Sequence, residues 1–170
     1  MHEIREAKPE EFSQLGELMV NVYSQLEGFP KPDKIPGYYQ ALKNVGEFTK
    51  HPKVKLFVAV SENNNVDGGL VYFGDMTYYG AGGKSTTSQY AAGFRLLAVN
   101  TKTRGKGLAK LLIRACINQA KKDGFNHLLI HSTKSMMVAW KIYERMGFIR
   151  FPDIDFTQNN VEVYGFKLSL

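Results

Sequence analysis

Cysteine is almost missing from this chain of 170 residues, which contains a single one, Cys116. One thiol cannot form an internal disulfide, so the fold must be stable without covalent cross-links. Cys116 lies among Leu112, Ile113 and Ile117. We therefore expect it to be a buried apolar residue rather than a nucleophile.

Long apolar runs are also missing. No window reaches the roughly 18 consecutive apolar residues that a membrane-spanning helix needs, and the first residues show no apolar core of a signal peptide. We therefore expect a cytoplasmic protein with no membrane partner. With 44% hydrophobic and 22% charged residues, the length suits one globular domain over 1–170 with a substantial core.

Negative charge is scarce in one stretch of the chain. Residues 95–150 contain twelve Lys or Arg against two Asp or Glu, a net charge of +10, whereas the rest carries −4. Such a basic stretch predicts an anionic partner. Aromatic residues are not interleaved with these cations and no nucleic-acid motif is present, so a phosphate-bearing small molecule is favoured over nucleic acid.

The periodicity of the chain predicts alternating strands and helices without an internal repeat. Strands are expected at 3–7, 54–60, 66–73, 91–99, 125–131 and 161–168. In the strand at 54–60, apolar residues stand at every second position, as in a strand with one buried face. Four helices are expected. The first begins at Pro9 and the second near Pro36, while the third ends near Gly124 and the fourth ends at Gly147.

Two of these helices have a predicted apolar face. In the helix that ends near Gly124, the face would carry Leu108, Leu111, Leu112, Ala115 and Gln119. In the helix that ends at Gly147, it would carry Val138, Ala139, Ile142 and Met146.

The segment 75–89 is predicted to be a flexible loop. Its residues 80–85, Gly-Ala-Gly-Gly-Lys-Ser, look like a phosphate-binding P-loop. Such a loop needs a glycine where this chain has Tyr78, and a helix with an apolar face should follow instead of Thr86, Thr87 and Ser88. The loop interpretation is therefore preferred.

Two cations and two glycines lie where the third helix should begin, in the run Arg104-Gly105-Lys106-Gly107-Leu108-Ala109. The helix macrodipole disfavours a cation at this end by roughly 0.3–1 kcal/mol per charge. The unpaired amides and the two basic side chains would together hold a phosphate or pyrophosphate well. Glycine would let the backbone approach that anion closely.

This run and a second motif resemble the GNAT superfamily of acyl-CoA-dependent N-acetyltransferases. The run matches the pyrophosphate loop of the family, Arg/Gln-x-x-Gly-x-Gly/Ala, and residues 139–148 match Ala-x-x-Leu-Tyr-x-x-x-Gly-Phe. The order of the predicted elements corresponds over nearly the whole chain. A Rossmann dinucleotide fold fits less well, because Lys110 stands where its third glycine belongs.

The resemblance implies an α/β (α+β) GNAT fold, with a mixed, largely antiparallel sheet of six to seven strands and about four flanking helices. It implies acetyl-CoA as co-substrate and no metal. Main-chain groups near Leu97 and Val99 would pair with the pantetheine like an added strand, and an amide there would hold the oxyanion of the tetrahedral intermediate. The residues assigned to acetyl-CoA are Leu97, Ala98, Val99, Arg104, Gly105, Lys106, Gly107, Leu108 and Ala109.

The resemblance also implies a catalytic role for Tyr143, which matches the general acid of the family. Its phenol would protonate the departing CoA sulfur; the alternative is a tyrosine packed in the core. The general base stays open. Many relatives have a carboxylate on the strand before the pyrophosphate loop, where this chain reads Ala-Gly-Phe-Arg at 92–95. Water, Glu27, Asp75 and His131 are the alternatives.

The acceptor is expected to be a small or amino-acid-like amine. Arg95 would either bind a carboxylate or phosphate of the substrate or pair within the sheet, and residues 151–155 would close the acceptor side or form a turn. A minority of six tyrosines would line the pocket: Tyr38, Tyr39, Tyr72, Tyr78, Tyr79 and Tyr90. Acetylation of protein amines and noncatalytic acyl-CoA binding are the alternative functions, and a homodimer, common among relatives, is possible.

Overall fold

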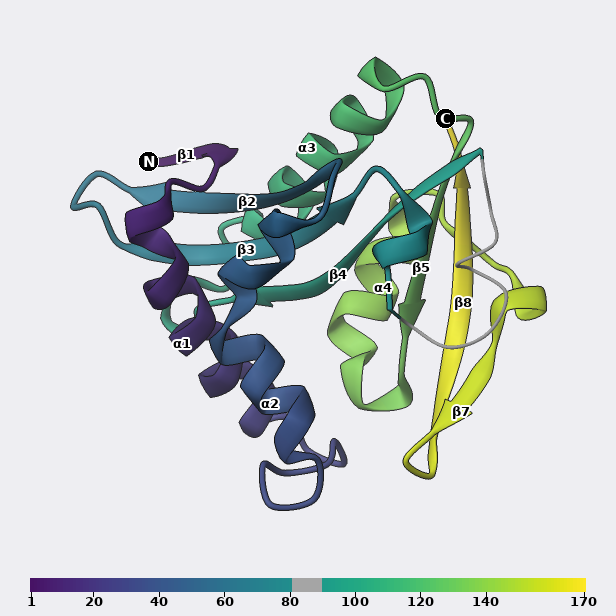
Figure 1. Ribbon diagram of the computed structural model, residues 1–170, viewed down its shortest axis with the longest axis horizontal. Coiled ribbons are helices and arrows are strands. Elements are labelled where there is room, and N and C mark those ends of the chain that lie inside the picture. The colour runs from purple at the N-terminus through teal and green to yellow at the C-terminus, as the bar shows by residue number, and fades with distance from the viewer. Residues whose placement is uncertain (81–89) are drawn as a thin grey trace.

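The computed structural model describes residues 1–80 and 90–170 (Figure 1). Its α-helices are α1 (Phe12–Ser24), α2 (Pro36–Lys43), α3 (Leu108–Lys122) and α4 (Met137–Arg145). Its strands are β1 (His2–Glu6), β2 (Val54–Ser61), β3 (Val66–Phe73), β4 (Ala91–Val99), β5 (His127–Ser132), β6 (Ile149–Arg150), β7 (Phe156–Gln158) and β8 (Val161–Ser169). None of the described helices is long and apolar enough to cross a membrane.

The strands form one mixed sheet in the order β1-β2-β3-β4-β5-β8-β6, and β7 pairs with β8. All described pairs are antiparallel except β4 with β5, which is parallel. The predicted largely antiparallel sheet with four helices is thus confirmed. The described part of the chain has eight strands rather than six to seven, because β6 and β7 are too short, at two and three residues, to produce a periodic pattern.

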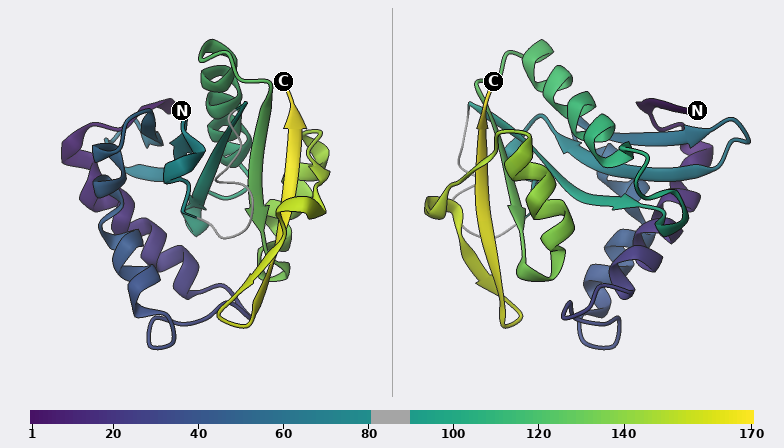
Figure 2. Two further views of the ribbon diagram at one scale, coloured as in Figure 1. Left: turned by 45° about the vertical axis from the view of Figure 1, so that its right-hand side comes forward. Right: turned by 180° about the vertical axis from the view of Figure 1, so that it is seen from behind.

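Helices cover both faces of the sheet, as the two views of Figure 2 show: α1 and α2 lie on one face, and α3 and α4 on the other. This arrangement corrects the expectation of a half-buried strand at 54–60. Val58 faces the α1 side and Ala59 the α3 side, and both are fully buried. A strand between two helical layers loses the polar alternation of a surface strand.

The buried faces of α3 and α4 differ in part from the predicted ones. On α3 the residues in the core are Leu108, Leu112, Ile113, Cys116 and Ala120, whereas Leu111 is exposed. On α4 the buried residue is Tyr143, and Val138 is 73% exposed. Cys116 is fully buried, as predicted, and burial raises the pKa of its thiol.

β4 and β5 pair only over a short stretch and then diverge. Their register joins residues 91–93 to residues 127–129, although β4 continues to Val99 and β5 to Ser132. The approach is tight at Gly93, where an added Cβ would lie 2.6 Å from the Leu129 carbonyl oxygen. Beyond that point the two strands open into a V in Figure 1. The sheet therefore has an internal edge at its centre, on which main-chain groups of β4 are left without a strand partner.

Candidate active site

A β-bulge bends β4 where it leaves β5. The β3–β4 register passes from Gly69 opposite Ala98 to Val71 opposite Arg95, so β4 carries one extra residue. Leu96, within the bulge, has φ +62°, a left-handed conformation that costs roughly 1–2 kcal/mol for a residue with a Cβ. Such backbone strain persists mainly at functional sites. A β-bulge bends its strand, and this one lies just after the last residue of β4 that pairs with β5.

Leu97, Ala98 and Val99, the residues predicted to contact pantetheine, follow this bulge. Ala98 is buried opposite Gly69 of β3, whereas Leu97 and Val99 are partly exposed. The Leu97 carbonyl accepts a hydrogen bond from the Tyr23 hydroxyl at 3.1 Å. This contact ties β4 to α1 on one side of the divergence.

The run 104–109, here called the cofactor loop, leads into α3. Gly105 and Gly107 have φ +83° and +76°, and Gly107 is the N-cap of the helix. An added Cβ at either glycine would meet no atom of the described chain within 4 Å. The glycines are thus required for backbone conformation rather than for packing within the protein, and the space in front of them is open.

Both cations of the cofactor loop are exposed. Neither Arg104 nor Lys106 forms an ion pair with a carboxylate in the described part of the chain. Two unneutralised cations therefore stand at the positive end of the α3 dipole. This combination favours a bound polyanion.

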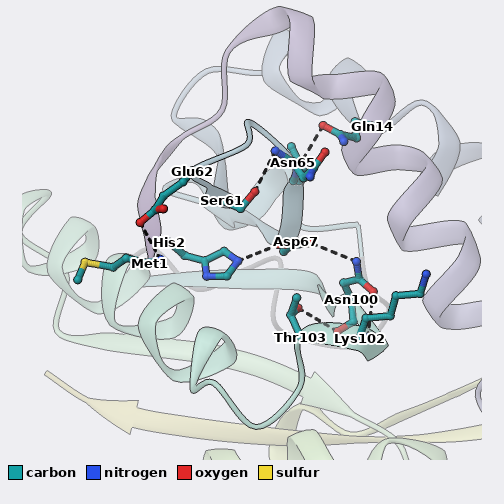
Figure 3. A network of polar contacts seen from close by, with 11 residues as sticks. Met1, His2, Gln14, Ser61, Glu62, Asn65, Asp67, Asn100, Lys102 and Thr103 are labelled. Carbon is teal, nitrogen blue, oxygen red and sulfur yellow. Dashed lines mark hydrogen bonds and ion pairs between the residues drawn. The ribbon is translucent and has the colours of Figure 1, made fainter.

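A polar network anchors the segment just before the cofactor loop (Figure 3). Asp67 of β3, 8% exposed, lies 2.8 Å from His2 Nε2 and accepts a hydrogen bond from Asn100 Nδ2 at 3.1 Å. The Asn100 amide donates to the Asp67 carbonyl, and Asn100 Oδ1 accepts from the Lys102 amide. No sequence pattern predicts this network, since its members come from distant segments.

A cavity of about 120 Å³ lies at the bulge, bounded by the segment after α1, by β4, by the end of β5 and by the β7–β8 hairpin. Its volume compares with the roughly 150 Å³ that admits a benzene molecule. Most of its wall is apolar or aromatic: Tyr23, Phe29, Ile35, Tyr38, Met136 and Phe156. Arg95 is the one Arg, Lys, Asp or Glu among the described residues that line it.

Two hydroxyls of the cavity wall lack a partner within the described chain. Ser132 and Thr133, at the end of β5, are 2% and 5% exposed, and their hydroxyl oxygens have no hydrogen-bond partner. Buried polar groups are nearly always hydrogen-bonded, since leaving them unpaired costs free energy. The two unpaired hydroxyls therefore mark the end of β5 as an unusual part of the cavity wall.

His131, one of the three candidate bases, lies in the cavity wall. Its Nε2 lies 2.8 Å from the Ile154 carbonyl oxygen, which can only accept, so Nε2 carries the proton. Nδ1 then accepts from the Tyr79 hydroxyl at 3.0 Å. Burial lowers the pKa of His131 to about 4. The imidazole is thus neutral at pH 7, in a single tautomer.

The other two candidate bases lie elsewhere. Glu27 is exposed and does not line the cavity. Asp75 caps the short helix Met76–Tyr78 by accepting from the Thr77 amide. No carboxylate lies in the described wall of the cavity.

Two of the six candidate tyrosines, Tyr38 and Tyr79, line the cavity. The others are engaged elsewhere or exposed: Tyr39 donates to the Pro30 carbonyl, Tyr72 donates to Asp123, Tyr78 stacks on His51, and Tyr90 is 70% exposed. Tyr23, which sequence reasoning missed, also lines the cavity. Its helical spacing is that of a core residue, and no sequence signal sets it apart.

Tyr143 lies on the α3 side of the sheet, not in the cavity wall. It is 5% exposed and packs against Phe94, Phe148 and Phe166. Its hydroxyl has no hydrogen-bond partner within the described residues, and burial raises its pKa. Burial is the largest cause of that rise, and the nearby Tyr79 phenol is the second.

The P-loop-like run at 80–85 lies, apart from Gly80, outside the described residues, as does most of the predicted loop 75–89.

The residues 151–155 include a short helix, Pro152–Ile154, that leads into β7. The Ile154 carbonyl accepts a hydrogen bond from His131 Nε2, so this segment holds the orientation of an imidazole that lines the cavity.

Comparison with known proteins agrees with the fold. Residues 46–170 match the family model described as an acetyltransferase (GNAT) domain. An uncharacterized N-acetyltransferase of Dictyostelium discoideum is 32% identical over 74 residues, which cover 44% of this chain and 34% of the relative. The match thus spans about a third of that relative's length. Since the family model covers most of this chain, the protein belongs to the GNAT acetyltransferase family, a class of acyltransferases, as predicted.

Solved structures share the fold at low sequence identity. A GNAT-family acetyltransferase of Staphylococcus aureus Mu50 superposes with a TM-score of 0.75 at 14% identity, covering 100% of this chain and 99% of that one. The PaiA N-acetyltransferase of Thermoplasma acidophilum, in complex with coenzyme A, gives 0.74 at 14% identity, with 99% of each chain covered. At such identities the likeness establishes the fold alone.

Proposed function

We propose that this protein transfers an acetyl group from acetyl-CoA to the primary amine of a small molecule. The single observation that carries the proposal is the V between β4 and β5, which leaves main-chain groups of β4 unpaired beside an open, cationic helix N-terminus. An extended amide chain with a pyrophosphate at one end matches that arrangement. The family and the coenzyme A held by the Thermoplasma neighbour support it.

In this proposal each part of acetyl-CoA has its own protein partner. The amides of the cofactor loop, with Arg104 and Lys106, bind the pyrophosphate through charge-assisted hydrogen bonds. Pantetheine lies along Leu97 and Val99, in the place that a continuing β5 would occupy. The acetyl group then lies at the bulge, between the cavity and Tyr143, where a β4 amide stabilises the oxyanion.

The chemical step is direct attack of the neutral amine on the thioester carbonyl. The C–N bond forms, the C–S bond breaks, and the CoA sulfur receives a proton as it leaves. Tyr143 is the proposed donor of that proton, because burial raises its pKa and keeps the phenol protonated at neutral pH. The proton of the amine leaves to water, since no carboxylate lines the described cavity and the His131 imidazole, with a pKa of about 4, is a weak base.

Calorimetric titration of acetyl-CoA into the wild type and an Arg104→Ala, Lys106→Ala variant tests the cofactor assignment. Loss of two charge-assisted contacts should weaken binding by about 100-fold or more. The matched control is Lys121→Ala, Lys122→Ala, which removes the same charge from the far end of α3 and should leave the affinity within about twofold. Equal weakening by both variants would show only a general charge effect, and no wild-type binding would refute the proposal.

The cavity favours a small acceptor over a protein amine. Its volume of about 120 Å³, near the roughly 150 Å³ that admits benzene, suits a small molecule rather than a protein segment. Acetylation of peptides but not of small amines would overturn this choice. Binding of acetyl-CoA without transfer to either would identify a noncatalytic acyl-CoA-binding protein.

A further inference from the structure

Arg95 is a charge without an ionic partner in the cavity wall. Its Nη1 donates to the Tyr79 carbonyl at 2.7 Å, and its guanidinium carbon lies 5.7 Å from the centre of the Tyr79 ring. None of the sixteen Asp and Glu of the chain, all within the described residues, forms an ion pair with it. A partly buried guanidinium has five N–H donors and favours an anion.

The charge of Arg95 acts on the titratable groups around the cavity. Burial raises the pKa of Tyr38 to about 12, and the Arg95 charge opposes that rise. Burial also lowers the pKa of His131, and the same guanidinium adds to the lowering. The described wall contains no carboxylate, but Asp155, which lies outside the wall, raises the pKa of His131 and opposes the Arg95 charge there. The cavity is therefore positive beside Arg95, and this part of it disfavours an acceptor whose only charge is an ammonium.

Two further residues of the wall carry unpartnered hydroxyls. Ser132 is the last residue of β5 and Thr133 follows it, whereas Arg95 comes from β4. The two strands thus bring a cation and two residues with unpaired hydroxyls to the wall of one cavity. An oxyanion accepts hydrogen bonds from all of these groups and would satisfy the donors that the protein leaves unpaired.

We propose, building on the acetyl transfer proposed above, that the acceptor is a small α-amino acid with an apolar side chain. Arg95, with the hydroxyls of Ser132 and Thr133, binds its carboxylate, and the aromatic wall formed by Phe29 and Tyr38 contacts its side chain. The site also accounts for the missing carboxylate base. Beside a guanidinium the amine loses its proton to water more readily, because the positive field disfavours the ammonium form.

A matched pair of acceptors tests this assignment. Leucine and 3-methylbutylamine differ only in the carboxylate, and release of the CoA thiol reports transfer to either. The wild type should favour leucine by about tenfold or more in kcat/KM, as a charge-assisted bidentate contact implies. Arg95→Met should reduce this ratio to near one, whereas Arg95→Lys should retain part of it. Arg114→Met, an exposed change on α3, should leave the ratio unchanged.

Two further measurements keep the outcomes distinct. N-Acetylleucine should bind the protein–CoA complex more tightly than N-(3-methylbutyl)acetamide does, and Arg95→Met should abolish the difference without any turnover being needed. Titration of acetyl-CoA into Arg95→Met should give the wild-type affinity, which establishes that the variant is folded.

Each contrary result refutes a specific claim. Equal rates for leucine and 3-methylbutylamine, unchanged by Arg95→Met, would overturn the carboxylate site and leave the proposed acetyl transfer intact. Transfer to other amines but to neither member of the pair would also overturn it. A preference for the phosphonate analogue of leucine over leucine would reassign the site to another oxyanion. Absence of acetyl-CoA binding by the wild type would instead refute the proposed function.

Discussion

The cofactor loop and the cavity beside Arg95 both adjoin the strands that diverge, β4 and β5, yet they are built differently. The loop is six consecutive residues, 104–109, whose backbone conformation and two cations are local properties. The cavity is assembled from α1, β4, β5 and the β7–β8 hairpin. In the proposed function, the site for the invariant part of acetyl-CoA is thus local in sequence, whereas the site that selects the acceptor is distributed over the fold.

Replacing Tyr143 tests whether one proton donor serves the reaction between the two regions. Of all the predictions, this one has the largest expected effect, a loss of turnover. Tyr143→Phe should lower turnover by about 100-fold or more, as loss of a general acid does, with acetyl-CoA affinity nearly intact. Steady-state kinetics and calorimetry measure the two quantities. Tyr78→Phe, which stacks on His51 away from the cavity, should change neither. Unchanged turnover of Tyr143→Phe across the pH range would refute the assignment.

On the cavity side, the buried imidazole of His131 should make stability depend on pH. Its folded-state pKa is about 4 against an ordinary value of 6.5, so the unfolded chain binds the proton first as the pH falls. The free energy of unfolding should therefore drop between pH 6.5 and 4, by about 3 kcal/mol at most.

Urea denaturation at several pH values measures this dependence. In His131→Asn the decrease over the same pH interval should be much smaller, whatever the stability of the variant at pH 7. Parallel pH profiles for the variant and the wild type would contradict the buried, neutral imidazole.

The smallest effect is expected where the network around Asp67 supports the cofactor loop. Asp67→Asn should weaken acetyl-CoA binding by up to about tenfold, because Asn100 loses a charged partner next to the loop. The preference between acceptors should not change, since the network is remote from the cavity. Asp33→Asn, an exposed change, is the control. A shift in acceptor preference, with acetyl-CoA affinity unaltered, would show that the two regions are not separable.

The same contrast explains what the sequence could predict. β3 and β4 have the expected bounds, because long runs of apolar residues ended by turn residues determine strands locally. The strands β6 and β7 were missed, since their few residues are held by pairing with β8 rather than by pattern. The exposure of Leu111 and Val138 was missed as well, because helix periodicity does not reveal which stripe meets the sheet.

The sites follow this rule in their details. The helix start and the exposed cations of the run 104–109 could be predicted, because glycines and cations at a helix N-terminus are recognisable in six residues, whereas its binding of acetyl-CoA stays a prediction. The strain at Leu96, the tautomer of His131 and the part played by Tyr23 could not, because each depends on contacts between segments far apart in the chain. Arg95 was recognised only as one of two alternatives, since its lack of an ionic partner is a property of the fold.

The most direct test of the central claim, that acetyl-CoA lies in the V between β4 and β5, is amide NMR of the ¹⁵N-labelled protein titrated with coenzyme A. We predict that the largest shifts occur at residues 97–99 and 105–109, with smaller ones at Ser132 and Thr133 and none along β1. Shifts confined to other segments, or none at saturating coenzyme A, would contradict the account.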